Sequence, residues 1–169
     1  MHDTPRYEPM ERSDFFADKR SARPLVEGTV ARGMLREDEH LNTGKVGGAP
    51  ATALPMAADL ALLQRGRQRY GIYCTPCHGL AGRGDGMVVR RGYRKPASLH
   101  EERLRAQPVG YFYDVITNGF GAMPDYAAQI GVRDRWAIVA YIRALQLSQH
   151  AGLQDVPADQ RPQLQAAAP

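Results

Sequence analysis

The chain of 169 residues contains two cysteines, Cys74 and Cys77, and His78 directly follows the second one. Two cysteines separated by two residues and followed by histidine form the attachment pattern of haem c. Two thiols at this spacing on a helical turn can each form a thioether bond with one vinyl group of the same porphyrin. The imidazole of the next residue then lies under the ring, where it can ligate the iron. The motif therefore predicts one covalently bound haem c, with His78 as an iron ligand.

Three other kinds of site can use two cysteines this close together. A redox-active dithiol requires a strand, a turn and a helix around the motif, whereas the residues before Cys74 have a helical pattern. A structural zinc site requires four ligands, and His100 is the further candidate ligand nearby in the sequence. A disulfide between such close residues would constrain little of the unfolded chain. We favour haem attachment over these three alternatives.

A second iron ligand is expected from the glycine-rich loop that ends at Pro124, a residue that would keep the loop stiff. The thioether of Met123 is a soft, neutral ligand, and together with histidine it raises the reduction potential of a haem, which suits electron transfer. Met123 lies 45 residues after His78, which leaves room to reach the opposite face of the ring. Met87 follows His78 by only nine residues, and His100 is the third candidate for this position.

Three segments have the apolar spacing of helices that would position these residues. The pattern predicts helices over residues 57–73, 108–118 and 133–146. The first helix leads into the cysteine motif, and the second ends at Gly119, a residue type that suits a helix end. The sequence therefore favours a helical domain in which the methionine loop lies between the second and third helices.

Gly66 lies inside the first predicted helix, where it would cost about 1 kcal/mol relative to alanine if nothing compensated. A close helix crossing would compensate, because a missing side chain lets a neighbouring helix approach the backbone. We expect the ring of Tyr141 or Trp136 to lie against Gly66, and Tyr70 to complete the contact.

Residues from about 59 to 150 resemble a class I cytochrome c domain. The glycine-containing helix, the cysteine motif, the methionine loop and the final helix occur in the order of that family. The resemblance implies an all-α fold around one covalently bound haem. It also implies that a backbone carbonyl from a proline-containing loop orients the ligating imidazole, and Pro96 is the candidate for this role. Tyr93 and Pro124 complete the residues that we expect to contact the cofactor.

The beginning of the chain resembles a more specific group of proteins. Residues 5–9, 13–16, 21–24 and 26–33 are similar to the mono-haem cytochrome c subunit of bacterial alternative complex III. That resemblance implies a place in a membrane assembly that oxidises quinol and passes electrons to a periplasmic carrier or a terminal oxidase. It implies three kinds of partner subunit: a multi-haem cytochrome c, an iron–sulfur subunit and polytopic quinol-binding subunits. In that family the subunit is a lipoprotein acylated on an N-terminal cysteine, and the sequence shows no such cysteine.

Composition divides the chain into three parts. Residues 1–58 are rich in proline and glycine yet contain many apolar residues, so we expect an extended irregular segment that contacts partner subunits or the haem domain, with disorder in isolation as the alternative. Residues 59–150 form the predicted haem domain, and residues 151–169 are predicted to be a loose tail.

No stretch approaches the roughly 20 apolar residues that span a bilayer, and no signal peptide is visible. The family resemblance implies the periplasmic side of the bacterial inner membrane, where partner subunits or a lipid anchor would hold the chain.

The formal net charge of +4 comes from the predicted haem domain. Its densest basic cluster, which we call the arginine cluster, consists of Arg90, Arg91, Arg94 and Lys95. Such a cluster can steer an acidic redox partner or pair with the haem propionates, and both interpretations stay open. Nucleic acid is a poor partner for it, because no interleaved aromatic platform or binding motif accompanies the basic residues.

The predicted function is outer-sphere electron transfer, with no substrate chemistry on this chain. A freely diffusing periplasmic cytochrome is the nearest alternative to a fixed subunit, and a haem enzyme or gas sensor with a labile sixth ligand is a more distant one. The long, apolar N-terminal segment favours the fixed subunit, because a diffusing carrier has no evident use for it.

Overall fold

The computed structural model describes residues 4–166. Residues 1–3 and 167–169, the ends of the predicted N-terminal segment and tail, lie outside the described residues. The chain separates into two compact units, Met1–Arg36 and Glu37–Pro169. Within the described residues, no helix is both long enough and apolar enough to cross a membrane.

The first unit is irregular between residues 4 and 36, with turns and one isolated bridge between Arg12 and Arg20. The backbone N–H of Ser13 donates to the carbonyl of Lys19 at 3.1 Å, which closes a small loop. Several large apolar side chains of this unit are exposed: Tyr7, Met10, Phe15, Leu25, Val26, Val30, Met34 and Leu35. The unit therefore combines little regular structure with much uncovered apolar surface.

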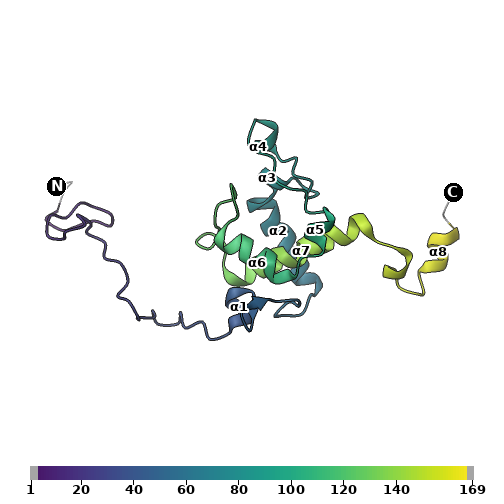
Figure 1. The fold of residues 1–169 in the computed structure, drawn as a ribbon, viewed down its shortest axis with the longest axis horizontal. Coiled ribbons are helices and arrows are strands. Elements are labelled where there is room, and N and C mark those ends of the chain that lie inside the picture. The colour runs from purple at the N-terminus through teal and green to yellow at the C-terminus, as the bar shows by residue number, and fades with distance from the viewer. Residues whose placement is uncertain (1–3, 167–169) are drawn as a thin grey trace. The chain divides into compact units, whose positions relative to one another are not determined.

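The second unit is mainly helical (Figure 1). Its elements in chain order are α1 (Glu39–Thr43), β1 (Lys45–Val46), β2 (Ala49–Pro50), α2 (Leu60–Tyr73), α3 (Thr75–His78), α4 (Met87–Arg90), α5 (Glu102–Arg105), α6 (Val109–Asn118), α7 (Val132–His150), the 3₁₀ turn η1 (Leu153–Asp155) and α8 (Arg161–Ala166). The two short strands form an antiparallel hairpin in which Val46 pairs with Ala49. The sequence analysis did not predict this hairpin, and η1 and α8 lie in the tail that it predicts to be loose.

The three predicted helices are confirmed, with ends that local chemistry sets. Helix α2 begins at Leu60 because the carboxylate of Asp59 caps it, accepting from the Leu62 N–H at 2.8 Å. Helix α6 ends at Gly119, which adopts the positive φ of +79°. Helix α7 continues beyond the predicted end to His150.

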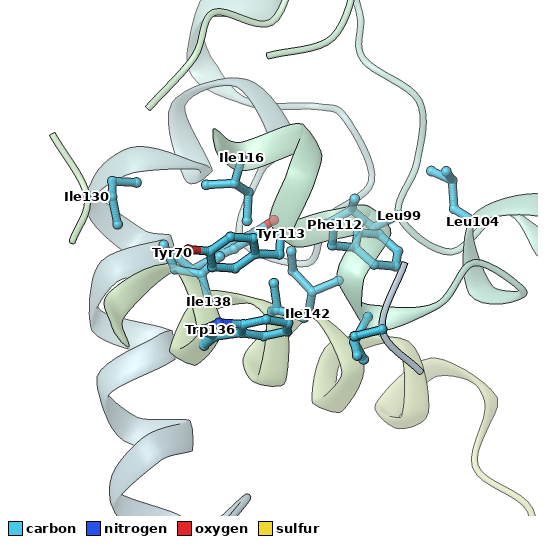
Figure 2. Packing of buried hydrophobic residues seen from close by; sticks show 13 residues of the cluster. Tyr70, Leu99, Leu104, Phe112, Tyr113, Ile116, Ile130, Trp136, Ile138 and Ile142 are labelled. Atoms are coloured by element: carbon cyan, nitrogen blue, oxygen red, sulfur yellow. The ribbon is translucent and has the colours of Figure 1, made fainter. Parts of the chain in front are cut away.

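Helix α7 supplies the centre of the hydrophobic core (Figure 2). Trp136, Ile138 and Val139 are fully buried, and the ring of Tyr113 from α6 stacks on Trp136 with 4.4 Å between the centroids. Burial of such large side chains on both helices is the main stabilising contribution to their packing.

Helices α2 and α7 cross at Gly66, as predicted. A Cβ atom at this position would clash with the carbonyl oxygen of Ala137 and would lie 2.8 Å from the Cβ of Tyr141. The surface against Gly66 is therefore mainly the backbone of Ala137. Of the two aromatic residues predicted to contact Gly66, Tyr141 does so through its Cβ atom, whereas Trp136 lies in the core. Tyr70, one turn further along α2, contacts Tyr141 with 5.4 Å between the ring centroids.

Residues 37–58 belong to the helical unit, whereas the sequence analysis placed them in the irregular N-terminal segment. The indole N–H of Trp136 donates to the carbonyl of Leu41 at 2.8 Å, and the hydroxyl of Tyr113 donates to the carbonyl of Asn42 at 3.1 Å. Two core aromatic side chains thus hold α1 on the domain. The unit boundary accordingly lies 22 residues earlier than predicted, after residue 36 instead of residue 58.

Replacement of Gly66 by alanine should lower the free energy of unfolding by about 1–3 kcal/mol, because the added methyl group overpacks a backbone contact. Gly71 provides a matched control in the same helix, since a Cβ there meets nothing within 4 Å. Gly71→Ala should leave stability unchanged or raise it by up to about 1 kcal/mol. Denaturant unfolding of both variants measures the difference, and equal effects would contradict the close crossing.

Candidate haem-binding site

The end of α2 leads directly into the cysteine motif. Cys74 terminates this helix, with its backbone N–H donating to the carbonyl of Tyr70 at 2.9 Å. Helix α3 follows at once, and the His78 N–H donates to the carbonyl of Cys74 at 2.8 Å. The hydroxyl of Tyr70 donates to the carbonyl of Gly79 at 3.0 Å, just after the motif. The motif therefore lies on helical turns that are hydrogen-bonded at both ends.

Burial of the motif favours a neutral His78 imidazole and disfavours a reactive thiolate at Cys74. Burial raises the pKa of the Cys74 thiol to about 12, and nearby Cys77 adds to the rise. A redox-active dithiol needs a lowered thiol pKa, so this environment speaks against that alternative. Burial also lowers the pKa of the His78 imidazole, which favours the neutral form that ligates metals.

One cavity of about 310 Å³ brings the predicted ligands together. Cys74, Cys77, His78 and Met123 all line it, although Met123 is 45 residues away from His78 in the sequence. The rest of its wall is largely apolar and includes Leu99, Leu104, Phe112, Val115, Ile116 and Ile130. Neither Met87, which is 58 % exposed, nor His100 belongs to this lining.

The residues present fit a haem c. The Nδ1 atom of His78 is buried and has no hydrogen-bond partner among the described residues. Both thiols are unpaired and half-buried at the edge of the same apolar cavity. Cys74 and Cys77 would hold the group covalently, and His78 and Met123 offer the donor pair that haem iron takes in electron carriers.

The loop that carries Met123 is a tight chain reversal. The backbone N–H groups of Phe120 and Met123 each donate to the other residue's carbonyl at 3.0 Å. A Cβ on Gly119 would lie 2.7 Å from the carbonyl oxygen of Met123, and φ at this glycine is positive. Glycine is therefore required at the start of the loop, for steric as well as conformational reasons.

Arg135 stabilises this loop from inside the core, a role that the sequence analysis missed. It is only 3 % exposed, and its Nε donates to the carbonyl of Ile130 at 2.9 Å. Its Nη1 donates to the hydroxyl of Thr117 at 2.6 Å. These two acceptors stand at opposite ends of the segment that contains Met123. The sequence feature that could have indicated this role is the position of Arg135 next to Trp136, at the start of the otherwise apolar face of the predicted last helix.

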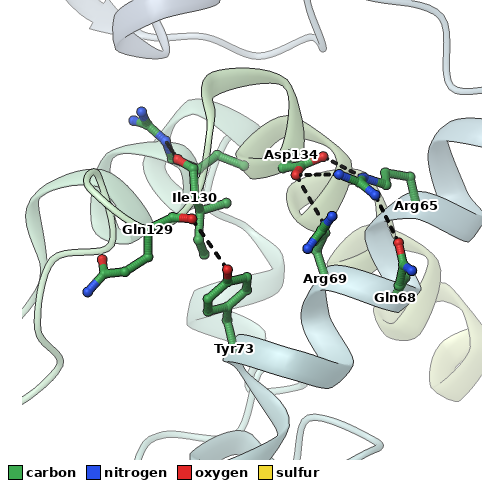
Figure 3. Close-up of polar contacts among 8 residues, drawn as sticks. Arg65, Gln68, Arg69, Tyr73, Gln129, Ile130 and Asp134 are labelled. Carbon is green, nitrogen blue, oxygen red and sulfur yellow. Dashed lines mark hydrogen bonds and ion pairs between the residues drawn. The ribbon is translucent and has the colours of Figure 1, made fainter.

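A second polar cluster joins α2 to the start of α7 (Figure 3). Asp134 accepts two hydrogen bonds from Arg65, at 2.7 and 2.8 Å, and lies 3.2 Å from Nε of Arg69. The hydroxyl of Tyr73 donates to the carbonyl of Gln129 at 3.3 Å. Asp134 lies 69 residues after Arg65 in the sequence, so a local sequence pattern could not predict this contact.

The remaining predicted contact residues, Tyr93, Pro96 and Pro124, also line the cavity. The family resemblance implied a hydrogen bond from the imidazole to the Pro96 carbonyl. No such bond forms among the described residues, where Nδ1 of His78 is without a partner.

The arginine cluster divides at the cavity. Arg94 and Lys95 line it, whereas Arg90 and Arg91 do not. Arg90 lies 3.8 Å from the carboxylate of Asp85. Part of the cluster therefore faces the cofactor site, and part of it lies outside.

One family model and one solved structure are similar to parts of this chain. Residues 61–142, just under half of the chain, match the family model described as cytochrome C oxidase, cbb3-type, subunit III. A chain of the reducing HAO-like protein complex of Kuenenia stuttgartiensis is similar in structure, with a TM-score of 0.48 and 23 % sequence identity. The match covers 63 % of this chain and 54 % of that one, so the present chain spans about half the length of the solved chain. No curated protein sequence matches the chain. Residues 61–142 are therefore similar to a cytochrome c family, and this similarity is consistent with haem c binding and electron transfer.

Proposed function

We propose that this chain transfers electrons through one haem c that is attached to Cys74 and Cys77 and ligated by His78 and Met123. The observation that carries the proposal is the single apolar cavity into which two distant segments bring both thiols, the imidazole and the thioether. When bound, a haem c with histidine and methionine ligands supplies reversible one-electron transfer. The cytochrome c domain suggests an electron carrier rather than an enzyme.

The protein's own contribution is a stiff, largely dry site. Apolar residues from α5 and α6, such as Leu104, Phe112 and Ile116, line the cavity and would exclude water. The hydrogen bonds of α3 fix the histidine side, and Arg135 fixes both ends of the methionine loop. Little movement is then needed between oxidation states, which suits electron transfer.

The rim of the cavity supports exchange of electrons with a negatively charged partner. Phe120 is 67 % exposed and lines the cavity, and the exposed cations Arg94 and Lys95 line it as well. Exposed apolar surface beside positive charge suits a transient complex with an acidic redox protein.

At a finer level, we propose that the chain is a fixed subunit of alternative complex III, on the periplasmic side of the bacterial inner membrane. Support comes from the resemblance of its N-terminal segments and from the exposed apolar residues of the first unit, which offer a surface for partner subunits. Those partners would be a multi-haem cytochrome c, an iron–sulfur subunit and polytopic quinol-binding subunits. Electrons would leave to a soluble acceptor or a terminal oxidase, and partner contacts or a lipid anchor would hold the chain. A freely diffusing carrier is the alternative.

Replacement of both Cys74 and Cys77 by alanine should abolish covalent haem attachment, whereas either single replacement should leave one thioether bond. Intact-mass spectrometry of the protein matured with haem and then denatured measures attachment. A double variant that retains the mass of haem would contradict the assignment of these thiols.

Met123→Ala should lower the reduction potential and open the iron to added ligands, because a soft neutral donor that favours the reduced state is lost. Met87→Ala is the matched control, since Met87 lies outside the cavity lining. Absorption spectra and redox titration of both variants test the assignment. A high-spin spectrum already present in the unaltered protein would favour the enzyme or sensor alternative.

Deletion of residues 1–36 should leave the haem spectrum and domain stability unchanged, because Glu37 begins the second compact unit. The same deletion should reduce recovery of the complex when the tagged chain is purified from membranes in mild detergent. Co-purification of the full chain with a multi-haem cytochrome and polytopic subunits would support the fixed subunit. Recovery of the full chain alone from the periplasmic fraction would identify a diffusing carrier.

A further inference from the structure

We propose that Tyr93 is a positioning residue that links the Met123 loop to the attachment segment, residues 74–78, and thereby slows loss of the methionine ligand. This inference rests on the proposed function, because it assumes that His78 and Met123 ligate one iron.

The chain just before α4 is hydrogen-bonded to the attachment segment. The Gly84 N–H donates to the carbonyl of His78 at 2.9 Å, and the Gly86 N–H donates to the carbonyl of Cys77 at 3.1 Å. A Cβ on Gly86 would clash with the carbonyl oxygen of Pro76, so the two backbones are in direct contact. The start of α4 is therefore attached to the residues that would bind the cofactor.

Backbone hydrogen bonds connect α4 to Tyr93. The backbone N–H of Tyr93 donates to the carbonyl of Val88 at 3.1 Å, and that of Gly92 donates to Val89 at 3.0 Å. Gly92 has a φ of +97°, which lets the chain turn back at this point. The backbone of Tyr93 thus has a position defined relative to α4.

The side chain of Tyr93 contacts the methionine loop. The hydroxyl of Tyr93 donates to the carbonyl of Ala122 at 3.3 Å, and Ala122 directly precedes Met123. The other hydrogen bonds of the loop tip lie within it, between Phe120 and Met123. Within the part of the chain that the structure describes, the Tyr93 hydroxyl is the hydrogen-bond donor from another segment to this tip.

The size of the effect follows from the setting of this hydrogen bond. Tyr93 is 52 % exposed, so water competes for the donor and the acceptor. A neutral hydrogen bond of this kind changes an equilibrium or rate by a factor of about 2 to 10. Loss of the hydroxyl should therefore leave the fold intact and act on the lifetime of the iron–sulfur bond of Met123.

The test compares Tyr93→Phe with Tyr141→Phe in the full chain carrying its covalent haem. Each variant loses one hydroxyl and keeps its ring, and Tyr141 lies outside the lining of the haem cavity. Stopped-flow mixing of the ferric protein with saturating imidazole measures replacement of the methionine ligand. The weak far-red absorption band of a ferric iron–methionine bond reports the same event. We expect replacement to be about 2- to 10-fold faster in Tyr93→Phe and unchanged in Tyr141→Phe.

Each other outcome has a distinct meaning. A far-red band in all three proteins with equal replacement rates would overturn the role of Tyr93 and leave the proposed ligands standing. Equal acceleration in both variants would also overturn it, because the effect would then be a general loss of stability. Absence of the band from the unaltered protein would refute Met123 as a ligand, and with it both proposals.

Discussion

The crossing of α2 over α7 at Gly66 is the constraint on which the rest of the helical unit depends. The last turn of α2 leads directly into Cys74, and the first turn of α7 follows the loop that carries Met123. Because the two helix backbones touch at Gly66, the distance between those two segments is set by contact and not by flexible side chains. The aromatic rings of Tyr113 and Trp136 pack α6 against α7, and other residues of α6, among them Phe112 and Ile116, line the cavity.

Two neighbouring residues at the start of α7 contact different parts of the helical unit. Successive residues on a helix point about 100° apart, so Asp134 contacts Arg65 and Arg69 on α2 while Arg135 enters the core. Burial of a guanidinium is costly unless its donors are satisfied. Ile130 and Thr117 supply two acceptors for Arg135, and the ring of Tyr113 lies 5.1 Å from the guanidinium carbon. The first turn of α7 thereby holds both α2, through Asp134, and the methionine loop, through Arg135.

The features predicted correctly from the sequence are those that local chemistry decides. Gly119 sets the end of α6 through its own dihedral angles, and Gly66 signalled a close approach because it is costly in a helix. The start of α2 was predicted three residues too early, at residue 57, because Asp59 caps the helix from outside it. Residues 37–58 were misassigned because Leu41 is held by Trp136, 95 residues away. Proline and glycine in that segment permit irregular structure, but they carry no information about which distant side chain will accept or donate a hydrogen bond.

The two segments that carry the proposed iron ligands differ in how many hydrogen bonds hold them, and this difference bears on the proposed function. The histidine side is helical, is hydrogen-bonded to α2 and to Gly84 and Gly86 just before α4, and lies next to two thiols that would fix the cofactor covalently. The methionine side is a four-residue reversal whose tip has two hydrogen bonds of its own and one from Tyr93. Loosening of that tip would open one iron position without releasing the cofactor. If the proposed ligands are correct, the cysteine motif would specify which cofactor is bound, and the stability of the methionine loop would decide whether the site transfers electrons or binds a further ligand.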